Sequence, residues 1–101
     1  MSNDLYDKIY LFVCAAIKEL FPRTRNIPIN PETSFKQDLN LDSLDGVDFI
    51  LYIEEHFGES VLDDDNVEEK AKFQSAMKGT IDDMVKFLME LTEQKGLKWV
   101  K

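Results

Sequence analysis

The sequence predicts an all-α protein, a small four-helix bundle with a long loop between its first and second helices. Four stretches repeat apolar residues at the three- and four-residue spacing of a helix that faces a core, and strand-like alternation is nearly absent. All three prolines lie within residues 21–41, where no helical period continues. The length of 101 residues is enough for one domain with a single modest core.

The first helix is expected over residues 5–20, where one apolar stripe recurs at helical spacing. Residues 2–4 offer polar caps for its start, and Pro22 helps to end it. The loop over residues 21–41 exceeds the roughly 12–15 residues beyond which structureless loops become uncommon in compact domains. Five apolar residues are expected to anchor this loop, namely Ile27, Ile29, Phe35, Leu39 and Leu41.

The second helix is expected over residues 43–57. Asp42 is a suitable N-cap, Asp45 follows as its capping-box partner, and Gly58 suits the stop. Gly46 in the first turn costs about 1 kcal/mol relative to alanine and is expected to loosen the helix there. The apolar residues expected along one stripe are Leu44, Val47, Ile50, Leu51, Ile53 and Phe57.

A third helix is expected over residues 66–77, capped by Asp65 together with Glu68. Its weak stripe consists of Val67, Ala71, Gln74 and Met77. Gly79 separates it from a fourth helix, which Thr80 caps with Asp83. The fourth helix carries a clear apolar face, made of Ile81, Met84, Val85, Leu88 and Leu91, and ends at the pair Lys95-Gly96.

The chain shows no internal repeat, low-complexity tract or interdomain linker. We therefore expect a single domain over residues 1–94, followed by a short C-terminal tail over residues 95–101 that contains Trp99. We expect this domain to act as a monomer.

Charge is distributed unevenly. Twenty acidic and twelve basic residues give a net charge of −8. Twelve of the acids lie between Asp38 and Glu69, where no lysine or arginine occurs, so this stretch carries −12 and the remainder carries +12 − 8 = +4. Such an acidic surface suits a basic protein partner and argues against nucleic acid, which needs cations to neutralise its phosphates.

Two further features bear on location. The single cysteine, Cys14, excludes an internal disulfide and favours a reducing compartment, so we expect a cytoplasmic protein. No apolar run approaches the ~20 residues of a membrane-spanning helix, so membrane insertion is not expected.

The tripeptide Asp42-Ser43-Leu44 lies where the long loop meets the second helix. A serine at this place is often just part of a helix cap, so the tripeptide alone is a weak signal. Its position strengthens the interpretation of Ser43 as a functional residue, because the unpaired N–H groups and the positive dipole end at a helix start favour a phosphate.

The residues around Ser43 resemble the signature of acyl carrier proteins, S-F-x-x-D-L-x-x-D-S-L-D, which residues 34–45 match without a gap. The similarity extends over roughly residues 4–92 and is weakest over residues 59–80. The family folds as a four-helix bundle, so the resemblance implies an acyl-carrier-like bundle. The departures from the commonest pattern indicate a specialised member, and they are Gly46, Tyr52, His56, a longer 66–79 segment and Trp99.

The resemblance implies that Ser43, flanked by Asp42 and Leu44, is the attachment site of 4′-phosphopantetheine. A phosphopantetheinyl transferase would move this group from coenzyme A, using Mg²⁺, to the Ser43 hydroxyl. The thiol of the arm would then hold acyl intermediates as thioesters for fatty-acid, polyketide or related lipid biosynthesis. The chain itself would be a carrier without catalytic activity.

The resemblance also implies a docking surface and an acyl-chain pocket. The acids assigned to docking on basic patches of the transferase and of acyl-transfer and synthase enzymes are Asp42, Asp45, Asp48, Glu54 and Glu55. Leu44 and Val47 are apolar candidates for the same surface. The candidates for sheltering an acyl chain are Phe35, Ile50, Leu51, Ile53, Val61 and Met84, each of which is also explained as ordinary core.

Other function classes remain open at this point. Residues 38–42 resemble the opening of an EF-hand loop, but Ser43 and Phe49 stand where that loop requires glycine and a bidentate glutamate. A closed site is therefore not expected, and weak Ca²⁺ binding is the alternative that remains. An unmodified acidic interaction module would explain the charge but not the signature around Ser43. An enzyme is disfavoured, because nothing in the sequence pairs Cys14 with the single histidine, His56.

Overall fold

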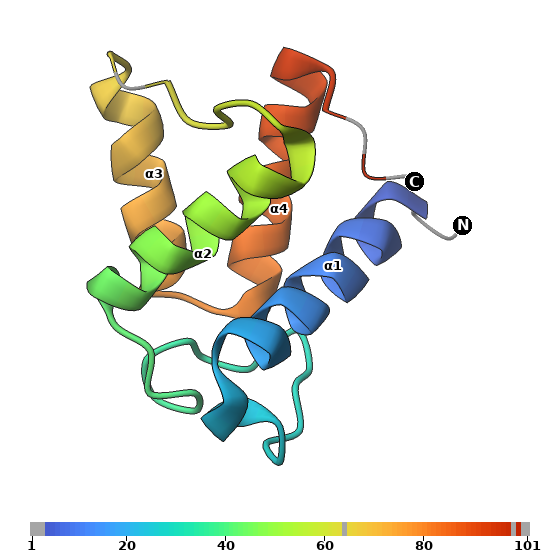
Figure 1. The fold of residues 1–101 in the computed structure, drawn as a ribbon, viewed down its shortest axis with the longest axis vertical. Helices are drawn as coiled ribbons and strands as arrows, with labels where there is room; N and C mark the ends of the chain where they lie inside the picture. The colour runs from blue at the N-terminus through green and yellow to red at the C-terminus, as the bar shows by residue number, and fades with distance from the viewer. Residues whose placement is uncertain (1–3, 64, 98, 100–101) are drawn as a thin grey trace.

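The computed structural model describes residues 4–63, 65–97 and 99. Within these residues the protein is built of helices, with no strand beyond one isolated bridge, so the all-α four-helix prediction is confirmed (Figure 1). The helices are α1 (Asp4–Leu20), α2 (Ser43–Phe57), α3 (Val67–Met77) and α4 (Ile81–Lys95), with a 3-10 turn at Pro22–Thr24.

The four helices are held in one body by contacts that cross the chain order. α1 packs mainly against α4, α4 also packs against α3, and α2 lies across the bundle in contact with both α1 and α3. In Figure 1 the first turn of α2 lies beside the C-terminal end of α3, although the two are more than thirty residues apart in sequence. This meeting point is where Ser43 is placed.

The long loop is fixed to the connection between α3 and α4. The Phe35 N–H donates to the Gly79 carbonyl at 3.2 Å, and the Ile81 N–H donates to the Thr33 carbonyl at 2.9 Å. Phe35, Leu39 and Leu41 are buried, as the sequence predicts for loop anchors, while Ile27 and Ile29 are half-buried.

The predicted caps of α2 and α4 are confirmed. Asp42 and Asp45 form a reciprocal capping box with two 3.0 Å hydrogen bonds, and Gly58 ends α2 in the left-handed conformation. Thr80 and Asp83 cap α4 in the same way. These caps are local in sequence, so the pattern alone identifies them.

The predicted cap of α3 is wrong by one residue. Asn66, not Asp65, is the N-cap, because its Oδ1 accepts from the Glu69 N–H at 2.9 Å. The Asp65 N–H instead donates to Asp63 Oδ1 in the preceding turn. This register turns Glu69 inward, and the buried residues of α3 are Glu69, Phe73, Ala76 and Met77. The expected stripe is therefore corrected: Val67, Ala71 and Gln74 are exposed, and of its four residues Met77 faces the core.

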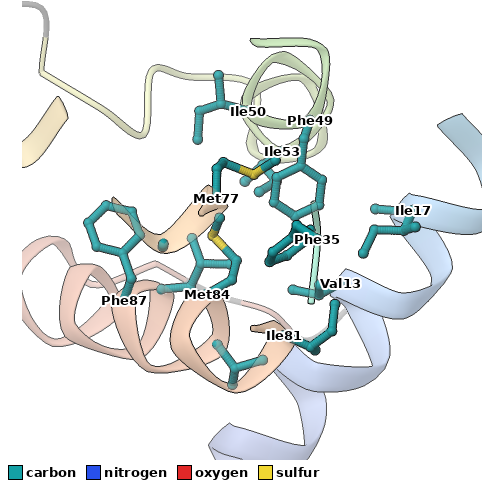
Figure 2. Close-up of a cluster of buried hydrophobic side chains, with 14 of the residues drawn as sticks. Val13, Ile17, Phe35, Phe49, Ile50, Ile53, Met77, Ile81, Met84 and Phe87 are labelled. Carbon is teal, nitrogen blue, oxygen red and sulfur yellow. The ribbon is translucent and has the colours of Figure 1, made fainter. Parts of the chain in front are cut away.

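The interior joins side chains from every helix and from the loop. The rings of Phe35 and Phe49 lie 6.4 Å apart between α1, α2 and α4, and Met77 and Met84 bring flexible thioethers into the same cluster (Figure 2). Phe49 is not part of the predicted stripe of α2, yet it is 1% exposed.

Trp99 packs against the bundle. Its ring lies 5.0 Å from Phe12 and 4.8 Å from Phe57, and its Nε1–H donates to Thr92 Oγ1 at 2.7 Å. The structure also places Lys95 in the last turn of α4. The division between a domain at residues 1–94 and a tail at 95–101 stays a prediction.

Candidate functional site

Ser43 is the first residue of α2 and is exposed. Leu41, two residues earlier, is buried and anchors the end of the loop, while the Asp42–Asp45 capping box fixes the start of the helix. Among the described residues, the Ser43 hydroxyl has no hydrogen-bond partner. A capped helix start thus presents a free hydroxyl to solvent, beside N–H groups that favour an anion.

A groove of about 380 Å³ opens next to Ser43, between the start of α2 and the end of α3. Its lining consists of Lys36, Leu41, Asp42, Ser43, Gln74, Met77 and Lys78. The sequence did not predict that Lys36, Gln74, Met77 and Lys78 would lie at this site. They come together with Ser43 only in the folded protein, where α2 packs on α3.

Gly46 sets how closely these two helices approach. A Cβ atom at this position would lie 3.1 Å from Met77 Cγ, which is closer than ordinary van der Waals contact. α2 is continuous through Gly46. Glycine has a lower helix propensity than alanine, but at this position it leaves space for Met77, which belongs to both the groove and the core.

The five acids expected at a docking surface have different surroundings. Asp48 and Glu55 are exposed, and neither forms an ion pair or hydrogen bond within the part of the chain that the structure describes. Asp42 is exposed but uses one oxygen in the cap. Asp45 completes the capping box and also lies 3.4 Å from Arg23 Nη2.

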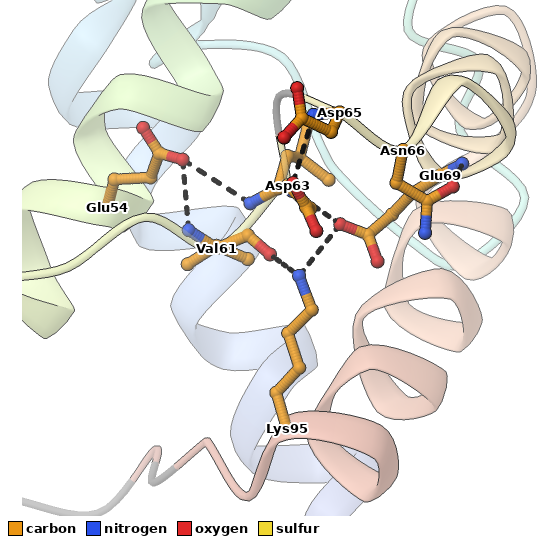
Figure 3. A network of polar contacts seen from close by, with 8 residues as sticks. Glu54, Val61, Asp63, Asp65, Asn66, Glu69 and Lys95 are labelled. Atoms are coloured by element: carbon orange, nitrogen blue, oxygen red, sulfur yellow. Dashed lines mark hydrogen bonds and ion pairs between the residues drawn. The ribbon is translucent and has the colours of Figure 1, made fainter.

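Glu54 is half-buried and holds the segment that follows α2 (Figure 3). Its Oε2 accepts from the N–H groups of Val61, at 2.9 Å, and Leu62, at 3.4 Å. Lys95 Nζ donates to the Val61 carbonyl and, at 2.7 Å, to Glu69 Oε1. We refer to Glu54, Glu69 and Lys95 as the loop clasp, because together they fix the chain between α2 and α3.

The apolar residues of α2 separate into two faces. Leu44, Val47 and Leu51 are exposed, at 75%, 48% and 54%, and their spacing places them along one outer stripe. The expectation that Leu51 faces the interior with the other acyl-pocket candidates is therefore corrected. The five remaining candidates belong to one buried cluster, namely Phe35, Ile50, Ile53, Val61 and Met84, and Phe49 and Met77 join them.

The residues that suggested a Ca²⁺ site or an enzyme have structural roles. Asp38 Oδ2 accepts from the Ser34 N–H at 2.7 Å, and Asp42 caps α2. Within the described residues, no three histidine, cysteine, aspartate or glutamate side chains form a group that could hold a metal ion. Burial raises the pKa of the Cys14 thiol, which disfavours the thiolate that a nucleophile needs. His56 packs between the rings of Phe12 and Phe57.

None of the described helices is both long enough and apolar enough to cross a bilayer.

Comparison with known proteins gives matches centred on the same region. A family model described as "Phosphopantetheine attachment site" matches residues 12–69. The chain is 41% identical over 58 residues to the acyl carrier protein of Thermosynechococcus vestitus, covering 57% of this chain and 60% of that protein. It is 43% identical over 49 residues to the acyl carrier protein of Nitratidesulfovibrio vulgaris, covering 48% and 63% of the two chains. No solved structure matches significantly.

The matched segment contains Ser43, the whole of α2 and the groove residues that precede α3. The chain spans about six-tenths of the length of these two curated relatives. The exposed hydroxyl and the adjacent groove fit a phosphopantetheine group. The resemblance carried by residues 34–45 is confirmed, and because the family model covers more than half of the chain, the protein belongs to the phosphopantetheine attachment site family.

Proposed function

We propose that this protein is an acyl carrier protein in which Ser43 Oγ bears 4′-phosphopantetheine through a phosphodiester. The observation that carries the proposal is the free, exposed Ser43 hydroxyl at the start of α2, within a gapless family signature and at the mouth of a groove. When bound, the group supplies a thiol that carries acyl intermediates as thioesters.

The protein's contribution is to position the arm. Asp42 and Asp45 fix the first turn of α2, so the attachment oxygen projects from a rigid element. Tethering gives the cargo a high effective concentration at each partner's active site. No residue near Ser43 needs to act as a base, because a separate transferase supplies that chemistry. The chain acts as a carrier in the cytoplasm. It is itself the substrate of the transferase and of the enzymes that process its acyl groups.

The outer face of α2 supports docking on such enzymes. Leu44, Val47 and Leu51 form an apolar stripe, and the exposed carboxylates of Asp48 and Glu55 lie on the same helix. A partner with an apolar centre and a basic rim would match this face. The partners we propose are a phosphopantetheinyl transferase and acyl-transfer or synthase enzymes of fatty-acid or related lipid and polyketide biosynthesis.

The buried cluster is the proposed shelter for an acyl chain. Phe35, Ile50, Ile53, Val61 and Met84 lie in the same interior as Met77. Because Met77 also lines the groove at Ser43, it connects the attachment site with this interior. Methionine side chains are flexible and adapt to occupants of different shape.

The test is the intact mass of the protein after incubation with a broad-specificity phosphopantetheinyl transferase, coenzyme A and Mg²⁺. The wild-type chain should gain one phosphopantetheine, and Ser43→Ala should gain none. Ser60→Ala is the matched control, because Ser60 is also exposed within the acidic stretch, and this variant should be modified normally. If folded wild-type protein that began without the group gains no mass, an unmodified acidic interaction module becomes the better account.

A further inference from the structure

Two lysines line the groove beside Ser43, and this inference rests on the function proposed above. Lys36 comes from the long loop and Lys78 from the end of α3. Lys36 lies two residues before the stretch 38–69, which contains no lysine or arginine, and Lys78 lies nine residues after it. The fold therefore brings two cations from distant parts of the sequence to the one serine of the family signature's Asp-Ser-Leu.

Neither lysine is used to balance a neighbouring carboxylate. Among the described residues, Lys36 and Lys78 form no ion pair or side-chain hydrogen bond. By contrast, Lys72, Lys86 and Lys95 each pair with a glutamate or aspartate. The two unpaired ammonium groups outnumber the one carboxylate in the lining of the groove, that of Asp42, so the lining as a whole attracts an anion.

The rest of the groove suits the part of the arm next to its phosphate. Leu41 and Met77 provide apolar contacts, and the Gln74 side chain offers an amide that can pair with an amide of the arm. The volume of about 380 Å³ lies near the lower end of the roughly 300–1,000 Å³ typical of small-ligand sites. Because Ser43 is one of the lining residues, a phosphate bonded to its Oγ is attached at the edge of this groove.

We propose that Lys36 and Lys78 bind the phosphodiester of the arm, and that the adjoining pantoyl part lies along the groove against Met77. Lysine binds phosphate as a point charge from a flexible stem, so the two exposed side chains can close on it without a change of fold. The arm then has a defined resting position, which it leaves when a partner enzyme engages it.

The test uses the modified protein with ¹³C-labelled methionine methyl groups, after its intact mass has shown that one arm is present. An NMR cross-peak is expected between the geminal methyls of the pantoyl group and the Met77 methyl. The double variant Lys36→Gln/Lys78→Gln should lose this cross-peak, and Lys36→Arg/Lys78→Arg should keep it. Raising the ionic strength to about 1 M, where the Debye length is about 3 Å, should weaken it in the wild type.

Lys8→Gln/Lys86→Gln is the matched control. It makes the same change in net charge at exposed lysines that do not line the groove, and it should keep the cross-peak. A modified wild-type protein without the cross-peak, or a Gln pair that retains it, overturns this inference alone. A chain that accepts no arm overturns the proposed function and this inference with it.

Discussion

Single residues on α2 have opposite environments although they are adjacent in sequence. Successive positions on a helix are rotated by about 100°, so three consecutive residues cannot all face the core, and of Phe49, Ile50 and Leu51 the first two are buried. The side chains of Ile50 and Leu51 are equally apolar, and the sequence pattern assigned both to the interior. The packing of Phe49 beside Phe35 turns Ile50 inward and leaves Leu51 outside.

Alanine substitutions test this placement. Ile53→Ala should lower the free energy of unfolding by about 2–5 kcal/mol, because it leaves a cavity in the core. Leu51→Ala should change it by about 0.5 kcal/mol or less, since the side chain is exposed. Urea unfolding of both variants measures the difference. Equal losses would mean that Leu51 is buried after all.

The exposed acid Asp48 has no structural partner among the described residues, so its substitution probes docking. Asp48→Lys should reduce kcat/KM for the phosphopantetheinyl transferase about 2- to 10-fold at low salt, with a smaller effect at high salt. Glu93→Lys, an equal charge change at an exposed position on α4, is the control. Matching rates for Asp48→Lys and wild type at low salt would show that this acid does not contribute to docking.

At the scale of whole elements, the connections are held by a few long-range polar contacts. The loop clasp joins α2, α3 and α4 through Glu54, Glu69 and Lys95. The positions of the helices were predictable because their periods and most of their caps are local, although the cap and the buried face of α3 were predicted wrongly. The clasp was not, because Lys95 lies 26 residues from Glu69 and 34 from Val61, and no local pattern links them.

Removing the Lys95 cation from the loop clasp should lower the stability of the fold. Lys95→Met leaves the Glu69 carboxylate buried without its ion pair, and we expect a loss of about 2–3 kcal/mol in the free energy of unfolding. Adding Glu69→Gln should restore part of this loss. Lys86→Met is the control, because its exposed pair with Asp82 contributes at most about 1 kcal/mol. Urea unfolding and amide exchange at Val61 report the effect, and equal costs for Lys95→Met and Lys86→Met would contradict it.

A second contact joins α1 to the start of α4. The Tyr6 hydroxyl donates to Asp82 Oδ1 at 2.6 Å. This hydrogen bond, with a smaller contribution from Lys86, lowers the pKa of the Asp82 carboxyl below 3.8. A lowered pKa in the folded state adds stability above pH 3.8, and that stability is lost as the pH falls through the lowered value.

Tyr6→Phe should therefore cost about 1 kcal/mol at pH 7, with the difference from wild type shrinking as the pH falls below 3.8. Tyr10→Phe is the control, since the Tyr10 hydroxyl donates to the Ile29 carbonyl, which does not titrate. Urea unfolding between pH 7 and pH 3 gives both differences. A cost for Tyr6→Phe that stays constant over this range would argue against ionised Asp82 as its partner.

Across the molecule, the acidic stretch is continuous in the sequence, whereas the groove forms only when distant segments fold together. The acids of residues 38–69 and the signature around Ser43 are contiguous, so the sequence was enough to predict a carrier with a charged docking surface. The groove is assembled from the loop, α2 and α3, and depends on the close approach at Gly46. Its lysines could not be assigned to Ser43 before the helices were packed.

The most direct test of the carrier function is to find the arm on the protein isolated from the cells that make it. Because no lysine or arginine lies between Lys36 and Lys70, trypsin releases one peptide, residues 37–70, that contains both Ser43 and Ser60. Tandem mass spectrometry of this peptide should place a phosphopantetheine on Ser43. An unmodified peptide, or a group carried on Ser60, would contradict the account.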